Sequence, residues 1–260
     1  MKVLVTFALE SEFAPWRSLR GFRRRGWAGA ESYCAKIGNA EIAVILTGVG
    51  PRNARLTAST VPWGEFDSLG FCISSGLAGA LRPGHGIGQI LAARNVLAET
   101  PRADAEGRVL PSSAPLISFA GECGATVVDA FCTTGRVVAR ADQKQHLGEI
   151  ADAVEMESFD ILHQAAESGV PAVAIRSVSD VAGEELPLDM NLIFSAEGKV
   201  SIPRVMGQVA MHPQAVPGLV RLGQQCKHAA ESLAKFLDRY VAAVIERMHA
   251  LDAKTTAATR

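Results

Sequence analysis

Short apolar runs alternate with segments of helical periodicity along most of the chain. The runs predict buried strands, because they are rich in Val, Ile, Leu and Ala and end in polar or glycine-containing turns; they cover residues 3–7, 69–74, 89–93, 126–132 and 171–178. Apolar residues at three- and four-residue spacing predict amphipathic helices over 158–167 and about 217–249. This alternation indicates an α/β protein, and no segment of residues 1–260 indicates a boundary to a second domain.

Two acidic residues follow the strands that flank the predicted helix over 158–167. Glu157 ends the short strand before this helix, Asp180 ends the strand after it, and Gly169 is placed to terminate the helix. Ligands of α/β sheets bind outside the carboxyl ends of the strands, so neighbouring strands would bring both carboxylates to one crevice. Two acids there suit general acid–base catalysis or hydrogen bonds to sugar hydroxyls. The structural alternative is that each acid only complements a helix N-terminus.

A third acidic residue and a glycine-rich turn follow other strands. Glu12 lies in the turn after the first predicted strand, where it could face the same edge of the sheet or serve as a first-turn acid of the next helix. Residues 47–51 (TGVGP) come after a predicted hairpin and before a helix. Their backbone N–H groups could approach an anion or a sugar oxygen, although a tight turn alone requires glycines too.

Composition and charge narrow the classes of function. The chain has 260 residues, is 48% apolar and has a net charge of −1, so it can bury a large core, and a nucleic-acid partner is not expected. Its five cysteines are scattered without ligand spacing, which indicates neither a disulfide framework nor a metal site. No apolar run reaches the roughly 18 residues of a membrane span, and no signal peptide is evident. We therefore expect a cytoplasmic protein.

Four segments in order resemble one enzyme family. VEMES at 154–158, followed by IRSVSD at 175–180, is similar to the signature of the nucleoside phosphorylase and nucleosidase family, which includes the methylthioadenosine/S-adenosylhomocysteine nucleosidases. The resemblance continues in MKVLVTFALESEF at the N-terminus, in TGVGPRNA and in SSGLAGALRPG. It implies a phosphorylase-like, three-layer α/β/α domain with a central mixed sheet. It also implies a small-molecule nucleoside substrate, a homo-oligomer based on dimers or trimers, and no metal or organic cofactor.

The resemblance implies a role for individual residues. Asp180 would protonate the leaving base, Glu157 would accept hydrogen bonds from the ribose hydroxyls, and Glu12 would hold the attacking water. Arg176 would steady the loop that carries Asp180. The substrate-binding residues that the resemblance adds are Met156, Ser75, Gly76, Ala78, Gly79, Val138 and Ser179.

Two departures from the family pattern leave alternatives open. Leu77 stands where the nucleosidases place a serine near the water, and no aromatic side chain accompanies Val138 at the expected base pocket. The chain also lacks the N-terminal phosphate motif of the phosphorylases, which favours hydrolysis. Its last third, however, resembles the hopanoid-associated phosphorylases, which would imply phosphate as co-substrate, with Arg52 as one candidate ligand, and an apolar 5′ pocket near residues 190–194. A non-catalytic nucleoside-binding protein is the third possibility.

Overall fold

The structure is a computed structural model that describes residues 1–27, 30–66, 70–99 and 109–258. Its ten strands form one mixed sheet and are β1 (Lys2–Phe7), β2 (Arg23–Trp27), β3 (Ala30–Ile37), β4 (Ala40–Leu46), β5 (Phe71–Ala80), β6 (Ile90–Ala98), β7 (Val109–Pro111), β8 (Thr126–Thr133), β9 (Ala153–Glu155) and β10 (Ala172–Asp180). The α-helices are α1 (Glu10–Arg20), α2 (Pro51–Ala58), α3 (Ala114–Glu122), α4 (Ala141–Leu147), α5 (Ser158–Glu167), α6 (Ile202–Met211) and α7 (Val216–Ala258).

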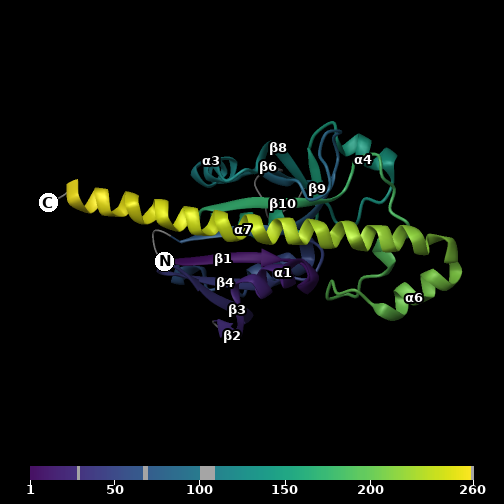
Figure 1. Ribbon diagram of the computed structural model, residues 1–260, viewed down its shortest axis with the longest axis horizontal. Helices are drawn as coiled ribbons and strands as arrows, with labels where there is room; N and C mark the ends of the chain where they lie inside the picture. Colours follow the sequence, from purple (N-terminus) through teal and green to yellow (C-terminus); the bar gives the residue numbers. More distant parts are fainter. Residues whose placement is uncertain (28–29, 67–69, 100–108, 259–260) are drawn as a thin grey trace.

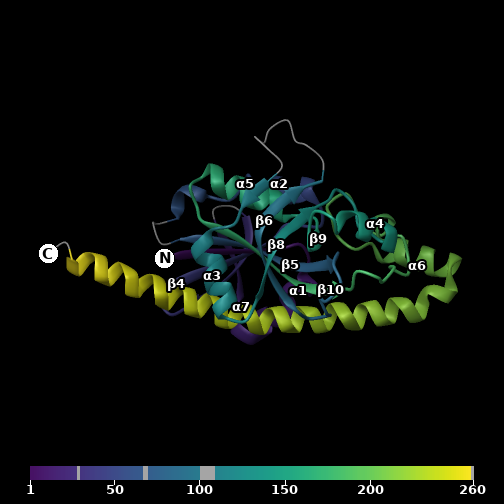
Figure 2. The same cartoon turned by 90° about the horizontal axis from the view of Figure 1, so that it is seen from above.

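Helices cover the sheet on both sides. The long helix α7 crosses one face together with α1 and α3, and α2 and α5 lie on the opposite face (Figures 1 and 2). Each helix layer has its own apolar core: Trp16, Leu237 and Tyr240 are fully buried on the α7 side, whereas Phe159 and Leu162 are buried on the α5 side. The predicted α/β fold with three layers and a mixed sheet is therefore confirmed.

Five strands of the sheet close into a ring. Strand β5 pairs with β9 and β10, β10 pairs with β6, β6 with β8, and β8 with β9. Four further strands extend from β5 in the order β1, β4, β3, β2, and β7 pairs with β6. The sequence patterns did not indicate this closure. It matters for function because β5 becomes the common neighbour of the two strands that carry the predicted acids.

Most predicted elements lie where the patterns indicated, with one informative error. Helix α5 coincides with the predicted helix, and Gly169 has the left-handed conformation (φ 69°) expected beyond its end. Residues 75–80, which lie beyond the predicted strand over 69–74, continue β5 to Ala80 and pair with β10 and, at Gly79 and Ala80, with β9. Among the described helices, none is both long and apolar enough to cross a membrane. The homo-oligomeric state stays a prediction.

Candidate active site

Three distant acidic residues meet at one cavity of about 250 Å³. Glu12 comes from the first turn of α1, Glu157 from the turn after β9 and Asp180 from the end of β10. The predicted residues Met156, Ala78, Gly79, Val138 and Ser179 also line this cavity. Ser75 and Gly76 do not: Ser75 is buried within the sheet, and Gly76 lies directly behind Glu12. The structure thus brings eight of the ten predicted site residues to one hollow.

Strand β5 holds the two strand ends together. Gly79 pairs with Asp180 of β10 on one side and with Val154 of β9 on the other, so both acid-bearing turns lie beside the same residue. A Cβ atom on Gly79 would lie 2.7 Å from an Asp180 carboxylate oxygen. Only glycine leaves room for this carboxylate, which explains in packing terms why the segment consists of small residues.

Glu12 has both of the roles that the sequence left open. Its Oε2 accepts hydrogen bonds from the backbone N–H groups of Ala8 (3.1 Å) and Leu9 (3.3 Å), so it caps α1 as its third helical residue. Its Oε1 faces the backbone N–H of Leu77 at 3.4 Å. Leu77 therefore contributes its main chain, not a side-chain hydroxyl, to this end of the cavity. Burial raises the pKa of Glu12, although Arg176 opposes the shift.

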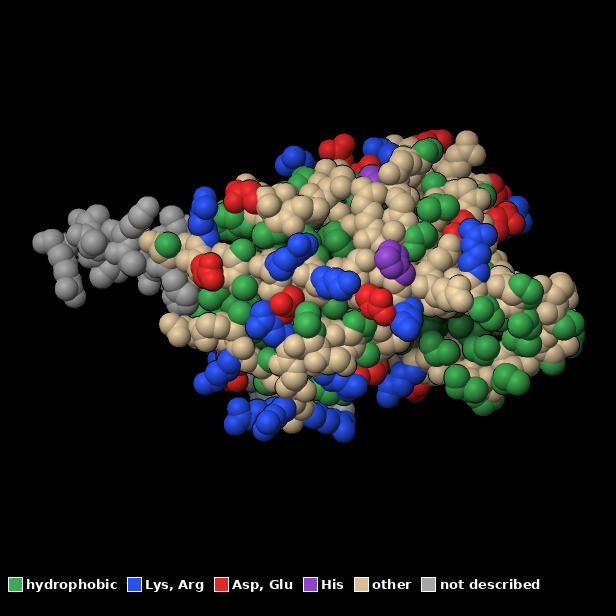
Figure 3. Space-filling view, in the orientation of Figure 1, with side chains coloured by type: hydrophobic (Ala, Val, Ile, Leu, Met, Phe, Trp, Pro, Cys, Tyr) green, Lys and Arg blue, Asp and Glu red, His purple; other side chains and the backbone are tan. Residues whose placement is uncertain are grey.

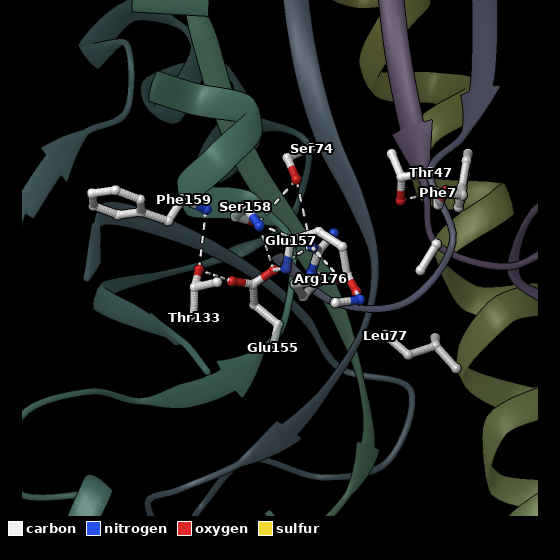
Figure 4. A network of polar contacts seen from close by, with 12 residues as sticks. Phe7, Thr47, Ser74, Leu77, Thr133, Glu155, Glu157, Ser158, Phe159 and Arg176 are labelled. Carbon is white, nitrogen blue, oxygen red and sulfur yellow. Dashed lines mark hydrogen bonds and ion pairs between the residues drawn. The ribbon is translucent and has the colours of Figure 1, made fainter. Parts of the chain in front are cut away.

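Glu155 and Arg176 form a buried ion pair behind Glu157. The Arg176 guanidinium donates to Glu155 and to Ser158 (2.9 Å), and Glu155 accepts the backbone N–H groups of Glu157 and Ser158 at the start of α5 (Figure 4). The expectation that Arg176 steadies the Asp180 loop was therefore wrong: it anchors the turn that carries Glu157. The residue that complements the α5 N-terminus is also Glu155, which leaves the Glu157 carboxylate available to the cavity.

Glu157 is a buried acid with an unfavourable neighbour. Its Oε1 accepts the backbone N–H of Gly50 at 2.9 Å, so the predicted glycine-rich turn meets an acidic group of the protein itself. Burial, reinforced by the nearby Glu155 carboxylate, raises the pKa of Glu157 to about 8, even though Arg176 lies 3.5 Å away and opposes the shift. Burial also opposes the ionisation of Glu155, but Arg176 and the Thr133 hydroxyl hold the pKa of Glu155 below its usual value.

Asp180 has a cationic partner that the sequence did not indicate. Lys144 of α4 is fully buried, and its ammonium group donates to the Asp180 carboxylate, to the Val181 carbonyl (3.1 Å) and to the Glu184 carbonyl (2.9 Å). The Ser179 hydroxyl donates to the other carboxylate oxygen at 2.8 Å. Both oxygens of Asp180 are therefore held in place. Lys144 was missed because it lies on a short, mostly polar helix, so only the tertiary contact distinguishes it from an exposed lysine.

Residues 2–209 match the family described as the Phosphorylase superfamily. The chain belongs to this family. It is 26% identical over 235 residues to a 5′-methylthioadenosine/S-adenosylhomocysteine nucleosidase of Geobacillus kaustophilus, covering 82% of this chain and 99% of that protein. It is 29% identical over 190 residues to a futalosine hydrolase of Streptomyces coelicolor, covering 64% and 77%. The protein is therefore an enzyme of the nucleosidase and nucleoside phosphorylase kind.

Solved structures of this superfamily share the fold. The structure of a futalosine hydrolase mutant of Helicobacter pylori superposes with a TM-score of 0.71 at 20% identity, covering 93% of this chain and 98% of that one. A Helicobacter pylori nucleosidase mutant with 5′-methylthioadenosine in its active site superposes with a TM-score of 0.70, also at 20% identity, covering 92% and 97%. At this identity, the likeness shows that the fold is shared.

Apolar side chains make up the rest of the cavity wall. Among the described lining residues of this cavity, Phe194 is the one aromatic residue. It lies far along the chain from Val138, where the resemblance to the family implies an aromatic side chain. Met190 joins Phe194 in this wall, whereas Ile193 is buried in the interior and Leu192 faces a second, larger cavity of about 980 Å³. The two cavities share the wall residues Arg136, Val137 and Leu186.

Proposed function

We propose that this enzyme cleaves the N-glycosidic bond of a purine nucleoside, with water as the nucleophile. The observation that supports this most directly is the convergence of Glu12, Glu157 and Asp180 on one mostly apolar cavity. Acids around one such cavity can serve the two halves of the reaction, in which a base leaves while positive charge develops on the sugar.

At one end, Asp180 acts as general acid. It transfers a proton to N7 of the base while the bond between the base and the ribose breaks, so that the base leaves uncharged. Ser179 and Lys144 fix the orientation of the carboxyl group. The Lys144 ammonium also stabilises the carboxylate that remains once the proton has left.

At the other end, Glu157 accepts hydrogen bonds from the 2′- and 3′-hydroxyls and stabilises the cationic sugar. Met156 packs against the ribose from the same turn. Glu12 orients the water and accepts the proton that the water loses as its oxygen bonds to the sugar, with the Leu77 backbone N–H beside it. Glu157 must be ionised for this role, so a bound cationic sugar ring favours loss of the proton that burial retains in the free enzyme.

The charges around Glu12 favour water over phosphate. Glu12, Glu155 and Glu157 lie close enough to influence one another, and phosphate would add a further anion to this group. Arg52, the candidate phosphate ligand, is exposed and is not among the lining residues of the cavity. Phosphate as co-substrate is therefore the second candidate.

One observation favours a substrate with a large apolar 5′ substituent. The cavity of about 980 Å³ shares a wall with the site, and Leu186, Leu188, Leu192 and Met211 are among its lining residues. A nucleoside with a bulky hydrocarbon at C5′, of the adenosylhopane type, would find room there. A 5′-methylthio group would leave most of this volume to solvent.

The deciding experiment measures release of free base from adenosine and from methylthioadenosine, with and without phosphate. Hydrolysis predicts free adenine and free sugar at the same rate in both conditions. Strict dependence on phosphate, with a sugar 1-phosphate as product, would replace water by phosphate in the proposal. Absence of free base from both nucleosides, with and without phosphate, would contradict cleavage of these purine nucleosides.

A further inference from the structure

The turn that follows Asp180 holds the ammonium group that faces Asp180. This turn covers residues 181–184, and the Glu184 backbone N–H closes it by donating to the Val181 carbonyl at 3.0 Å. The Lys144 ammonium has three donors. Their acceptors are the Asp180 carboxylate, the Val181 carbonyl (3.1 Å) and the Glu184 carbonyl (2.9 Å). Because two of the three acceptors belong to the turn, the position of the turn determines where the buried ammonium lies relative to Asp180.

The side chain of Glu184 connects this turn to α7. Gln225 donates its amide Nε2 to both carboxylate oxygens of Glu184, at 3.2 Å each. Arg221, one helical turn earlier, lies 3.3 Å from the same carboxylate, but its side chain is 68% exposed, whereas that of Glu184 is 16% exposed. Figure 3 shows both basic and acidic side chains over α7, so an exposed arginine there has other charges and solvent as neighbours. The Gln225 amide is therefore the main anchor of the carboxylate.

The part of α7 that binds Glu184 also forms a wall of the active-site cavity. Leu222 and Cys226 line the cavity, and Gln225 lies between them in the sequence. Glu184 is not among the described residues that line the cavity. Its side chain therefore does not meet a nucleoside bound there, and any influence of Glu184 on the reaction passes through Lys144.

We propose that Glu184 is a positioning residue for the reaction, because its carboxylate fixes the turn that holds Lys144 against Asp180. This role rests on the proposed function, in which Asp180 is the general acid. Without the Glu184 carboxylate, the turn loses its connection to α7, and the Lys144 ammonium loses fixed acceptors. Lys144 then stabilises the carboxylate that proton transfer leaves behind less well, since a hydrogen bond weakens as its geometry departs from the optimum. The loss appears in kcat and not in KM, because the contact strengthens only as the proton leaves.

The kinetics of base release from adenosine and from methylthioadenosine test this role. We expect Glu184→Ala to lower kcat about fivefold with little change in KM. In the Lys144→Met background, the same substitution should lower kcat by less than about twofold, because the residue through which Glu184 acts is already gone. An equal loss in both backgrounds, or a wild-type kcat in Glu184→Ala, would overturn the proposal.

The anchor on α7 offers a rescue and a matched control. Gln225→Glu places a second carboxylate against Glu184 and should lower kcat about as much as Glu184→Ala. Adding Glu184→Gln to this variant exchanges the acid and the amide, restores the hydrogen bond in the opposite direction and should recover most of kcat; a swap that recovers nothing would contradict the proposal. The control is Asp238→Ala, which removes an acid of α7 that accepts from Trp16 (3.3 Å) and Arg20. It should keep the wild-type kcat, and circular dichroism should show all variants folded.

Two results distinguish the role of Glu184 from that of Asp180. A rate within a few-fold of wild type in Asp180→Asn would reject the general acid, and with it the effect of Glu184 on catalysis. The link between Glu184 and Lys144 is measured without substrate, as non-additive losses of the unfolding free energy in the cycle of Glu184→Ala and Lys144→Met. Strictly additive losses would contradict this link, whichever residue proves to be the acid.

Discussion

Two acids of the active-site cavity, Glu157 and Asp180, have opposite electrostatic surroundings. Glu157 lies beside another carboxylate, Glu155, whose guanidinium partner Arg176 is already engaged. Asp180 pairs with the buried ammonium group of Lys144, which forms no other ion pair among the described residues. Burial and the Glu155 carboxylate therefore oppose the ionisation of Glu157 until a cationic sugar is present. The Lys144 ammonium stabilises the negative charge that Asp180 carries after it has transferred its proton. Position in the fold, and not residue type, separates the two roles.

Removal of the Asp180 carboxylic acid should have the largest effect on catalysis. We expect Asp180→Asn to reduce the rate of base release about 10³-fold, because the amide cannot transfer a proton to the base. The buried Lys144 would then lack its partner, so the variant should also lose stability. The double variant Asp180→Asn/Lys144→Met should regain stability in thermal unfolding but remain inactive. A rate within a few-fold of wild type in either variant would remove Asp180 from the mechanism.

The acid at the other end should matter somewhat less. Glu157→Gln keeps the shape of the side chain but removes its charge, so base release should fall about 10²-fold, the scale of one preorganised electrostatic interaction. The exposed Glu167, at the end of α5, offers a control on the same element. Glu167→Gln should retain the wild-type rate, and equal losses in the two variants would mean that Glu157 acts only through the stability of α5.

Lys144 tests whether the surroundings of Asp180 matter apart from Asp180 itself. We expect Lys144→Met to reduce the rate about 10-fold and to change its pH profile on the limb where the acid must hold its proton, because the ammonium no longer stabilises the carboxylate product. Lys144→Arg should restore part of the rate. The exposed Lys235 serves as the control, and Lys235→Met should have no effect. A pH profile that stays unchanged in Lys144→Met would leave Lys144 with a packing role alone.

The last effect concerns stability and tests the surroundings of Glu157 without substrate. The pKa of Glu157 rises from its ordinary value of 4.5 to about 8 on folding, so folding is favoured while this group is protonated. The stabilisation is complete below pH about 4.5 and is lost as the pH rises through about 8. The unfolding free energy of the wild type should therefore fall over this window, by on the order of a few kcal/mol. Glu157→Gln should flatten the fall in denaturant titrations, and an unchanged slope would contradict the raised pKa.

Patterns along the chain were sufficient for the elements but not for their closure into a ring. Apolar periodicity placed α5, β1 and β10 within about two residues, because burial of one face imposes a regular spacing. The continuation of β5 through its small residues was missed, because glycine, serine and alanine are typical of turns. The Asp180 carboxylate lies against Gly79 of this strand and leaves no room for a larger side chain there. The spacing of residues along the chain does not reveal such a neighbour.

By itself, the sequence determined the family, the α/β architecture and the three acids at strand ends, because each depends on local order along the chain. Only the tertiary structure decided which group each acid meets: Glu155 and Arg176 beside Glu157, Lys144 beside Asp180, the Leu77 backbone N–H beside Glu12. Lys144 lies 36 residues from Asp180 along the chain, and Leu77 lies 65 residues from Glu12. The charge that an acid carries depends on the few ångströms around it, and folding brings those neighbours together.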